Sequence, residues 1–231
     1  MKSIIRLYLV IMILSISIQC DKDEPIPIVN IPDNNFLNAL IDMGIDTDED
    51  GKISQSEVEI VTTLNVSDKS ISDLTGIENF VDLEYLECQN NQLTNLDVSN
   101  NTTLKFLYCE YNQLSSLDVS NNAVLSVLHC EYNQLTNLNI SNNDSIYYLN
   151  CFVNQLSSLD VANISVLGYL ICGYNQLTSL DVSNNINLIA LNLMGMPSLN
   201  EICVWEIPFP PDGVGIDITD SPNVYFTTDC N

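Results

Sequence analysis

A hydrophobic pattern of fixed period runs through the middle of the chain. Leucine and cysteine recur every 21 residues, and the cysteines of this pattern are Cys88, Cys109, Cys130, Cys151 and Cys172. A leucine lies two residues before and five residues after each cysteine, and an asparagine lies three residues after it. Each unit reads Leu-x-x-Leu-x-Cys-x-x-Asn-x-Leu-x-x-Leu-Asp-Val-Ser-x-Asn with conservative changes, as in residues 83–101. A repeat of this length predicts a solenoid.

The Leu-x-Cys segment of each unit predicts a short strand, because buried and exposed positions alternate there. A constant period then places successive strands side by side, parallel and in register. One unit cannot bury its own apolar side, so we expect stacked units to form the core. The asparagine of each unit should satisfy backbone groups of neighbouring bends. The second half of each unit lacks a helical length or period, and we expect irregular or short 3₁₀ structure there.

This pattern is that of the leucine-rich repeat, and it resembles internalin-type repeats over about residues 61–200. A cysteine in the third leucine position is similar to the internalin J variant of that repeat. The resemblance implies a right-handed leucine-rich repeat solenoid with short parallel strands on a concave face and a convex side without full helices. With a degenerate unit at each end, we expect roughly seven turns. Horseshoes of this kind bind unrelated partners, so the resemblance does not name a ligand.

Side chains that alternate with the buried leucine and cysteine should face the concave side and form columns across the units. Nine of the twenty residues in these columns are aromatic, whereas the whole chain is 7% aromatic. Tyrosines with interspersed acids are typical of an interface. An alternative is that the rings only pack on each other and stabilise the sheet. The predicted ligand-binding residues are Tyr85, Glu87, Phe106, Tyr108, Glu110, Tyr111, His129, Glu131, Tyr132, Tyr148, Phe152, Tyr169 and Tyr174.

The five repeat cysteines are predicted to be reduced rungs of the core, since a buried free cysteine behaves as a small hydrophobe. Metal binding and redox pairing are alternatives, but the chain has no Cys-x-x-Cys motif. The repeat pattern fades after residue 200, and residues 201–231 are expected to form a C-terminal cap with Trp205 and Phe226 as covers. A disulfide between Cys203 and Cys230 is predicted in an oxidising compartment, with two free thiols as the alternative.

A calcium-loop motif lies before the repeats. Residues 46–57 fit the twelve-position EF-hand loop, with Gly51 at the sharp turn. A helix over residues 34–43, capped by Asp33, and an exit helix from Ser56 should flank the loop, so residues 33–60 form an EF-hand-like N-terminal cap. Only one such loop occurs, which favours structural Ca²⁺ over a switch, and a solvated acidic loop is the alternative. The predicted ligands are Asp46, Asp48, Asp50, Lys52 through its carbonyl, Ser54 and Glu57.

The first residues predict export. Residues 1–19 combine basic residues with a short apolar run, which is typical of a signal peptide. Cys20 resembles the lipidated cysteine of a lipobox, and the following Asp-Lys-Asp-Glu resembles the surface-export signal of Bacteroidetes-type lipoproteins. Residues 20–32 would then be a lipidated, proline-containing and mobile tether. We expect an outer-membrane, surface-exposed lipoprotein held only by its lipid anchor. An ordinary cleaved signal, giving a secreted or periplasmic protein, is the alternative.

The charge balance narrows the function. Thirty acidic residues against six basic ones give a formal net charge of -24, which would repel a nucleic acid. His129 is the only histidine, and no nucleophile is predicted beside it, so the chain is not expected to be an enzyme. The sequence therefore predicts a cell-surface recognition or adhesion scaffold that binds a protein partner on its concave face. The alternative is a surface glycan-binding lipoprotein for nutrient capture.

Overall fold

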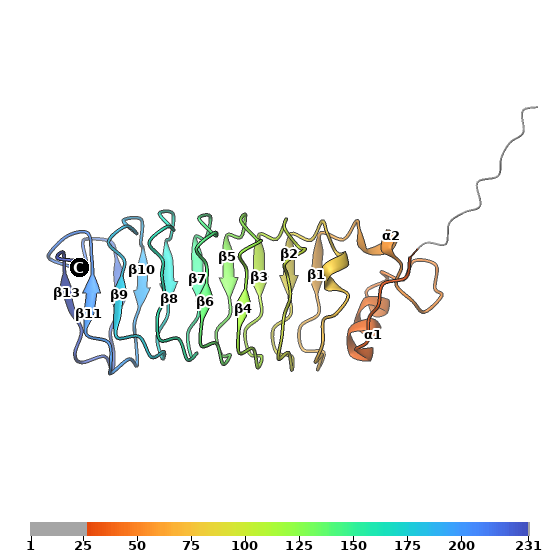
Figure 1. The fold of residues 1–231 in the computed structure, drawn as a ribbon, viewed down its shortest axis with the longest axis horizontal. Helices are drawn as coiled ribbons and strands as arrows, with labels where there is room; N and C mark the ends of the chain where they lie inside the picture. The colour runs from red at the N-terminus through yellow and green to blue at the C-terminus, as the bar shows by residue number, and fades with distance from the viewer. Residues whose placement is uncertain (1–26, 231) are drawn as a thin grey trace, which may run out of the picture.

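Eight short strands form the main sheet of the protein. The computed structural model describes residues 27–230, and its coils lie in a row along the long axis with the helices at one end (Figure 1). All neighbouring strands of the main sheet are parallel. In spatial order they are β1 (Thr63–Asn65), β2 (Tyr85–Glu87), β3 (Phe106–Tyr108), β5 (Val127–His129), β7 (Tyr148–Asn150), β8 (Tyr169–Ile171), β10 (Ala190–Asn192) and β12 (Gly215–Asp217).

The constant period of the sequence keeps these strands in register. Leu86 of β2 pairs with Leu107 of β3, which pairs with Leu128 of β5. The central leucines of β2, β3 and β5 are fully buried, and the residues on either side of them are half-buried on the other surface of the sheet. The predicted parallel leucine-rich repeat solenoid is therefore confirmed, and its main sheet has eight strands where roughly seven turns were expected.

The side of the coils opposite the main sheet is more regular than we expected. Short parallel ladders occur there, and among the described residues the only 3₁₀ helix is η1 (Ile77–Asn79). A constant period aligns equivalent backbone groups of neighbouring coils, so they pair even where the local sequence has no strand pattern. The paired segments are β4 (Leu117–Asp118) with β6 (Leu138–Asn139), and β9 (Ser179–Asp181) with β11 (Glu201–Cys203) and β13 (Tyr225–Thr227).

Two columns of buried asparagine join the coils. The Asn133 side-chain amide donates to the carbonyls of Cys109 and Cys130 at 3.0 and 3.2 Å, and its oxygen accepts the Leu114 N–H at 2.9 Å. Similar bonds recur at Asn91, Asn112, Asn154 and Asn175, as the repeat predicted. A second column donates to carbonyls of the preceding coil and contains Asn101, Asn122, Asn143 and Asn185.

A helical segment covers the N-terminal end of the stack. The helix α1 (Asn34–Asp42) begins after Asp33, whose carboxylate accepts the N–H of Asn35 at 2.8 Å. Phe36 and Leu40 of α1 are fully buried in the same core as the coils. The helix α2 (Gln55–Val58) follows the acidic loop and begins with a capping box between Ser54 and Glu57. Terminal caps of this kind cover the apolar layer that a last coil leaves open.

Residues 27–32 correct the expectation of a mobile tether. Val29 is buried and donates its N–H to the Ile53 carbonyl at 2.8 Å. Ile28 forms an antiparallel bridge with Ser54. The apolar residues at the end of the proline-containing segment therefore pair with the acidic loop instead of remaining free. The reason is that one alternating apolar side chain finds a place in the core, while the exposed backbone edge of the loop supplies hydrogen-bond partners.

The predicted signal peptide, Cys20 and the first part of the tether lie outside the described residues. Residue 231 also lies outside them. Among residues 27–230, no helix has both the length and the apolar character needed to cross a membrane.

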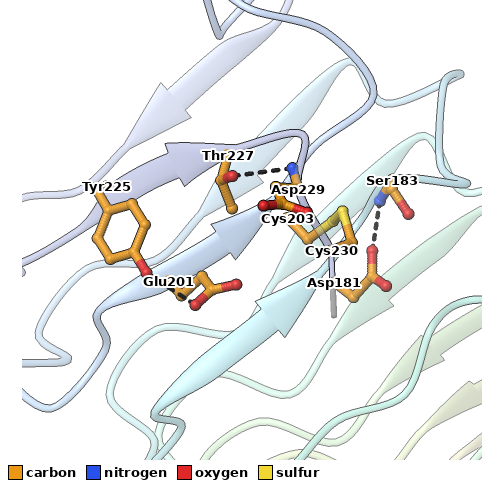
Figure 2. Close-up of a disulfide and its surroundings, with 8 residues drawn as sticks. All are labelled: Asp181, Ser183, Glu201, Cys203, Tyr225, Thr227, Asp229 and Cys230. Atoms are coloured by element: carbon orange, nitrogen blue, oxygen red, sulfur yellow. Dashed lines mark hydrogen bonds between the residues drawn. A yellow bond between two sulfur atoms is a disulfide. The ribbon is translucent and has the colours of Figure 1, made fainter.

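The C-terminal segment continues the stack as well as closing it. The strand β12 joins the main sheet beside β10, and β13 pairs with β11 on the opposite side. The leucine motif is absent there, but pairing along a sheet edge needs only backbone groups. The Phe209 ring lies 5.2 Å from Trp205 and 5.0 Å from Phe226, and the three rings pack against the core. A disulfide joins Cys203 of β11 to Cys230, with their Cα atoms 5.6 Å apart (Figure 2).

Candidate ligand-binding face and metal loop

The outer surface of the main sheet carries the residues predicted to bind a ligand. The strands direct them outward because the alternating positions, such as Leu107 and Cys109, are buried in the core. We call this surface the main-sheet face. It is defined by Tyr85, Glu87, Phe106, Tyr108, Glu110, Tyr111, His129, Glu131, Tyr132, Tyr148, Phe152, Tyr169 and Tyr174.

One row of rings crosses the main-sheet face at the strand positions. The Tyr85 and Tyr108 ring centroids are 5.4 Å apart. His129 lies between Tyr108 and Tyr148, with centroids 4.9 Å apart on each side and interplanar angles of 19° and 14°. Tyr148 continues the row to Tyr169 at 5.4 Å. Each such pair contributes about 0.5–1.5 kcal/mol beyond its buried area. In this row the rings pack on one another, as the alternative interpretation of the aromatic columns expected.

A second row lies at the bend that follows the strands. Tyr111 and Tyr132 stack with centroids 4.3 Å apart, and Phe152 meets Tyr132 and Tyr174 edge-on. Tyr111, Tyr132 and Tyr174 are 49%, 39% and 44% exposed. Burial within the sheet therefore does not account for this row. Exposed tyrosines held in fixed positions offer ring area and a hydroxyl to a ligand at low entropic cost.

Glu110, His129 and Glu131 converge on the same face. Each offers a carboxylate oxygen or an imidazole nitrogen that lies within 4.8 Å of those of the other two. His129 Nδ1 lies 3.2 Å from Glu131 Oε1. Burial raises the pKa of Glu110, and the neighbouring charge of Glu131 raises it further. The face thus combines exposed rings with partly desolvated acidic groups, an arrangement that favours basic ligand groups.

The five repeat cysteines lie in the core as free, fully buried side chains. Burial raises the pKa of each thiol, and that of Cys172 to about 12. The thiolate is the nucleophile and metal ligand, so these groups are inert at neutral pH. The sulfur of Cys130 lies 3.4 Å from the Asn150 carbonyl of the next coil. The predicted ladder of cysteines is present and is part of the core.

The acidic loop folds around Asp46. The Asp46 carboxylate accepts the N–H of Asp50 at 3.2 Å and the N–H of Gly51 at 2.9 Å. Gly51 has a φ of 79°, which is the left-handed conformation that the predicted turn requires. At the exit of the loop, Ile53 is buried and its backbone pairs with Val29. The N-terminal segment thereby supports the edge of a loop that has no second EF-hand beside it.

Glu57, the last predicted metal ligand, closes the loop back on itself. It accepts the N–H groups of Ser54 at 2.8 Å and Thr47 at 2.6 Å. These bonds, the Ser54 N–H first, lower the pKa of Glu57 from 4.5 to about 2. Oxygens of Asp46, Asp48 and Glu57 lie within 4.8 Å of one another. Hard, negatively charged oxygens at this spacing fit a calcium ion.

Of the other three predicted loop ligands, the Asp50 carboxylate does not belong to this group of oxygens, whereas the Ser54 hydroxyl contacts Glu57. Asp50 accepts the N–H of Lys52 at 2.8 Å, and Ser54 donates its hydroxyl to Glu57 at 2.8 Å. Lys52 is predicted to bind the ion through its backbone carbonyl alone, and its ammonium group lies 4.0 Å from the Asp50 carboxylate. Asp50 keeps a second carboxylate oxygen, and the Ser54 hydroxyl oxygen keeps its lone pairs, for a metal ion. The donor set of the loop fits calcium, and three of its carboxylates are already close together.

Sequence reasoning missed two properties of the main-sheet face. Tyr111, Tyr132 and Tyr174 have φ values of 52°, 51° and 51°, a left-handed backbone that tyrosine rarely adopts. Only Asn90, in the same column, is of a type that favours this conformation. The burial of Glu131 was also missed, because alternation places a side chain on a face but does not show how deeply its neighbours cover it. Tyr132, which follows Glu131 in the sequence, and Phe152, one repeat later, were the available signal.

Comparisons with known proteins agree with this architecture. No family model matches the chain. Internalin J of Listeria monocytogenes is 35% identical over 71 residues, which is 31% of this chain and 8% of that protein. The solved functional domain of internalin J from Listeria monocytogenes, described as including a cysteine ladder, is 28% identical with a TM-score of 0.53. That match covers 89% of this chain and 47% of the solved domain.

A second solved structure extends the likeness in fold. Internalin C2 of Listeria monocytogenes has a TM-score of 0.58 at 20% identity, over 88% of this chain and 99% of that structure. At this identity the likeness concerns the fold alone. The chain spans less than half of the internalin J domain and a small part of the whole internalin J protein. With its 21-residue period, its parallel main sheet and its cysteine ladder, the chain is an internalin-like leucine-rich repeat protein.

Proposed function

We propose that the protein is a recognition scaffold that binds a protein partner through the main-sheet face. The observation that carries this proposal is the second aromatic row. Tyr111, Tyr132 and Tyr174 are 39–49% exposed, while the cysteine two residues before each of them is fully buried in the core. Exposed, positioned tyrosine beside acidic groups is the composition expected of a contact surface for a partner with basic residues.

The likeness to internalin-type domains supports the same role at the level of fold. The buried thiols are not available as nucleophiles, since burial raises their pKa well above neutral pH. The acids on the face add a further expectation. Because exposed charges are screened by salt, binding to a basic protein partner should weaken as ionic strength rises. A glycan that stacks on the tyrosines would show little salt dependence.

A triple variant of the exposed row, Tyr111→Ala, Tyr132→Ala and Tyr174→Ala, tests the proposal. Immobilised wild type and variant are compared in capture from bacterial and host surface extracts at low and high salt, beside a glycan array. The matched control is Tyr225→Ala, since Tyr225 is 52% exposed on β13, on the side opposite the main sheet. Salt-sensitive capture that the triple variant loses and the control keeps supports a protein partner. Glycan binding with the same loss would favour nutrient capture, and an unchanged triple variant would eliminate the face.

We further propose that the acidic loop binds a structural calcium ion. Three of its carboxylates lie within 4.8 Å of one another, and the loop is supported by α1 and by residues 27–29. A bound ion would stiffen the cap that covers the first coil. Calorimetry should detect calcium binding by wild type, and Glu57→Gln should abolish it because the bidentate carboxylate loses its charge and one of its two oxygens. Equal binding by both proteins would contradict this assignment.

We propose a location at the cell surface, held by a lipid on Cys20. The support is the sequence of the first residues, which lie outside the described part of the chain. Metabolic labelling with a fatty acid should mark the wild-type protein and not Cys20→Ala. Protease treatment of intact cells then separates surface exposure from a periplasmic location. A protein that never incorporates the label would contradict the anchor.

A further inference from the structure

The centre of the main-sheet face contains two carboxylate oxygens that lack a partner. Glu110 Oε2 and Glu131 Oε2 are buried from water and accept no hydrogen bond. Glu131 is only 9% exposed. A buried carboxylate oxygen without a hydrogen bond or a counter-charge is among the most unfavourable groups in a folded protein. No lysine or arginine forms an ion pair with either residue in the described part of the chain.

Asparagines of the second buried column also have buried oxygens without a partner, but they differ from the two glutamates. Asn101, Asn122 and Asn143 each leave Oδ1 unpaired, but each donates two hydrogen bonds and is neutral. Glu110 and Glu131 are acids on adjacent coils and repel each other when both are ionised. The repeat explains the asparagine column, because it recurs from coil to coil. It does not explain unpartnered buried oxygens on two acids of adjacent coils, since the equivalent acid pairs elsewhere, Asp97 with Asp118 and Asp160 with Asp181, are exposed.

A histidine completes the group. His129 is held between the rings of Tyr108 and Tyr148, with centroids 4.9 Å apart on each side. Its Nδ1 lies 3.2 Å from Glu131 Oε1. One ligand atom from each of Glu110, His129 and Glu131 lies within 4.8 Å of the other two. The imidazole is therefore positioned by stacking, and its partners come from two neighbouring coils.

We propose that Glu110, His129 and Glu131 bind a divalent transition-metal ion of the zinc class. Two carboxylates and one imidazole form a mixed oxygen and nitrogen set, which suits Zn²⁺ better than Ca²⁺ or Mg²⁺. The ion would neutralise the two acids and give partners to the unpaired oxygens. At metal–ligand distances of about 2.0–2.2 Å, two ligands of one tetrahedral ion lie about 3.3–3.6 Å apart. Atoms within 4.8 Å reach that spacing by small rotations of the glutamate side chains.

Three protein ligands leave a tetrahedral ion with one open position. This position would face outward, beside the exposed rings of Tyr111 and Tyr132, and water or a group from a ligand would fill it. Occupancy of the site needs only the ion and can be tested without a partner, although Glu110, His129 and Glu131 are also part of the face proposed to bind one. The site is separate from the acidic loop, which offers oxygen alone.

The single histidine of the chain makes the test direct. The full chain, freed of metal and carrying Glu57→Gln to disable the acidic loop, is titrated with Zn²⁺ while NMR follows the imidazole signals of His129. The expected result is a saturable shift. Glu110→Gln and Glu131→Gln should each weaken the apparent affinity roughly tenfold or more, since loss of a ligand matters at least as much as loss of its outer-shell support. Glu84→Gln, which alters a surface carboxylate paired with Lys105, should leave it unchanged.

If Glu131→Gln fails to fold, Glu110→Gln still tests the site, because Glu110 is less buried than Glu131. The dispersion of the amide spectrum confirms folding. No shift with Zn²⁺, or equal shifts in all variants, would overturn the site and leave only a surface imidazole. A shift produced by N-acetylarginine amide and not by Zn²⁺ would also overturn it, and would indicate a pocket for a partner's basic side chain.

Discussion

The two surfaces of the main sheet follow different rules. The inner surface repeats the same residues in five successive coils, with leucine at the strand centre, cysteine two residues after it and asparagine at the bend. The outer surface occupies the same backbone, yet its residues differ from coil to coil. In the column of Glu87, the next coils carry Tyr108, His129, Asn150 and Ile171.

This difference separates what stacking requires from what it permits. A buried position must match its copies one coil above and below, because close packing and buried hydrogen bonds tolerate little change. An outward position has only to tolerate its neighbours. Residues that vary there are free to serve recognition. The comparison predicts that inner substitutions act on stability and outer substitutions act on binding.

The largest expected effect is on the inner asparagine column. Asn133→Ala leaves the N–H of Leu114 buried without a partner, and it removes one of the two side-chain amide bonds that the carbonyls of Cys109 and Cys130 each accept. At about 1–3 kcal/mol for the unsatisfied group and about 1 kcal/mol for each of the other two lost bonds, we expect a loss of about 4 kcal/mol in unfolding free energy. Urea unfolding measures it. Asn121→Ala, which removes one exposed bond to Ser99, should lose less than about 1 kcal/mol. Equal losses of unfolding free energy in Asn133→Ala and Asn121→Ala would contradict this prediction.

Loss of the disulfide at the C-terminal end of the stack should lower the unfolding free energy somewhat less. Replacing Cys203 and Cys230 by serine opens a loop of 27 residues' separation. We expect a loss of about 3 kcal/mol, because the crosslink restricts the unfolded chain. Thermal unfolding of the double variant checks this value, with the wild type under reducing conditions as a second comparison. A thermal midpoint that neither change lowers would show that Trp205, Phe209 and Phe226 suffice to close the stack.

Substitutions within a single coil compare the inner and outer surfaces of the main sheet directly. Cys130→Ala removes a fully buried sulfur and should lower the unfolding free energy by about 1–2 kcal/mol. Tyr132→Ala, two residues further on the outer surface, should lower it less while removing a contact residue. The five thiols of the wild type should also resist a thiol reagent until denaturant is added, because they are buried. Rapid labelling of the native protein would contradict the buried ladder.

The smallest effect concerns the pH dependence of the N-terminal cap. The N–H groups of Ser54 and Thr47 lower the pKa of Glu57 to about 2, against 4.5 in its ordinary range. A carboxyl whose folded pKa is lowered contributes stability above its unfolded pKa and loses it as pH falls toward the folded value. Stability should therefore decline between about pH 4.5 and pH 2, without added calcium, more in wild type than in Glu57→Gln. Urea unfolding at several pH values measures the difference, and parallel curves would contradict it.

Much of the fold could be predicted because the repeat states the same physical constraint many times. The period alone placed Leu86, Leu107 and Leu128 in one buried row and Asn133 against its neighbours. The ladder of β4 and β6 was not predicted, because it depends on alignment between coils and not on local pattern. The coil around β12 was missed for the same reason, since its backbone pairs without the leucine motif.

The candidate site could be located from the sequence but not characterised. Alternation placed Glu110, His129 and Glu131 on one face, and the structure shows that two of their oxygens have no partner. Burial depends on how the rings on either side lean, which no period specifies. The exposure of Tyr132 likewise follows from a left-handed bend that register imposes on it. The type of each site residue and the face it lies on could thus be predicted from the sequence. The burial of these residues and the distances between them depend on the assembled stack.

The central claim is that the partner contacts the main-sheet face, and site-specific photo-crosslinking tests it most directly. A benzophenone amino acid is placed at Tyr132 on this face or at Tyr225 on the opposite side, and each protein is irradiated with surface extract. Both positions are exposed, at 39% and 52%. We expect a crosslinked partner from position 132, in an amount that high salt lowers, and none from position 225. Crosslinking from position 225 alone, or equally from both, would contradict it.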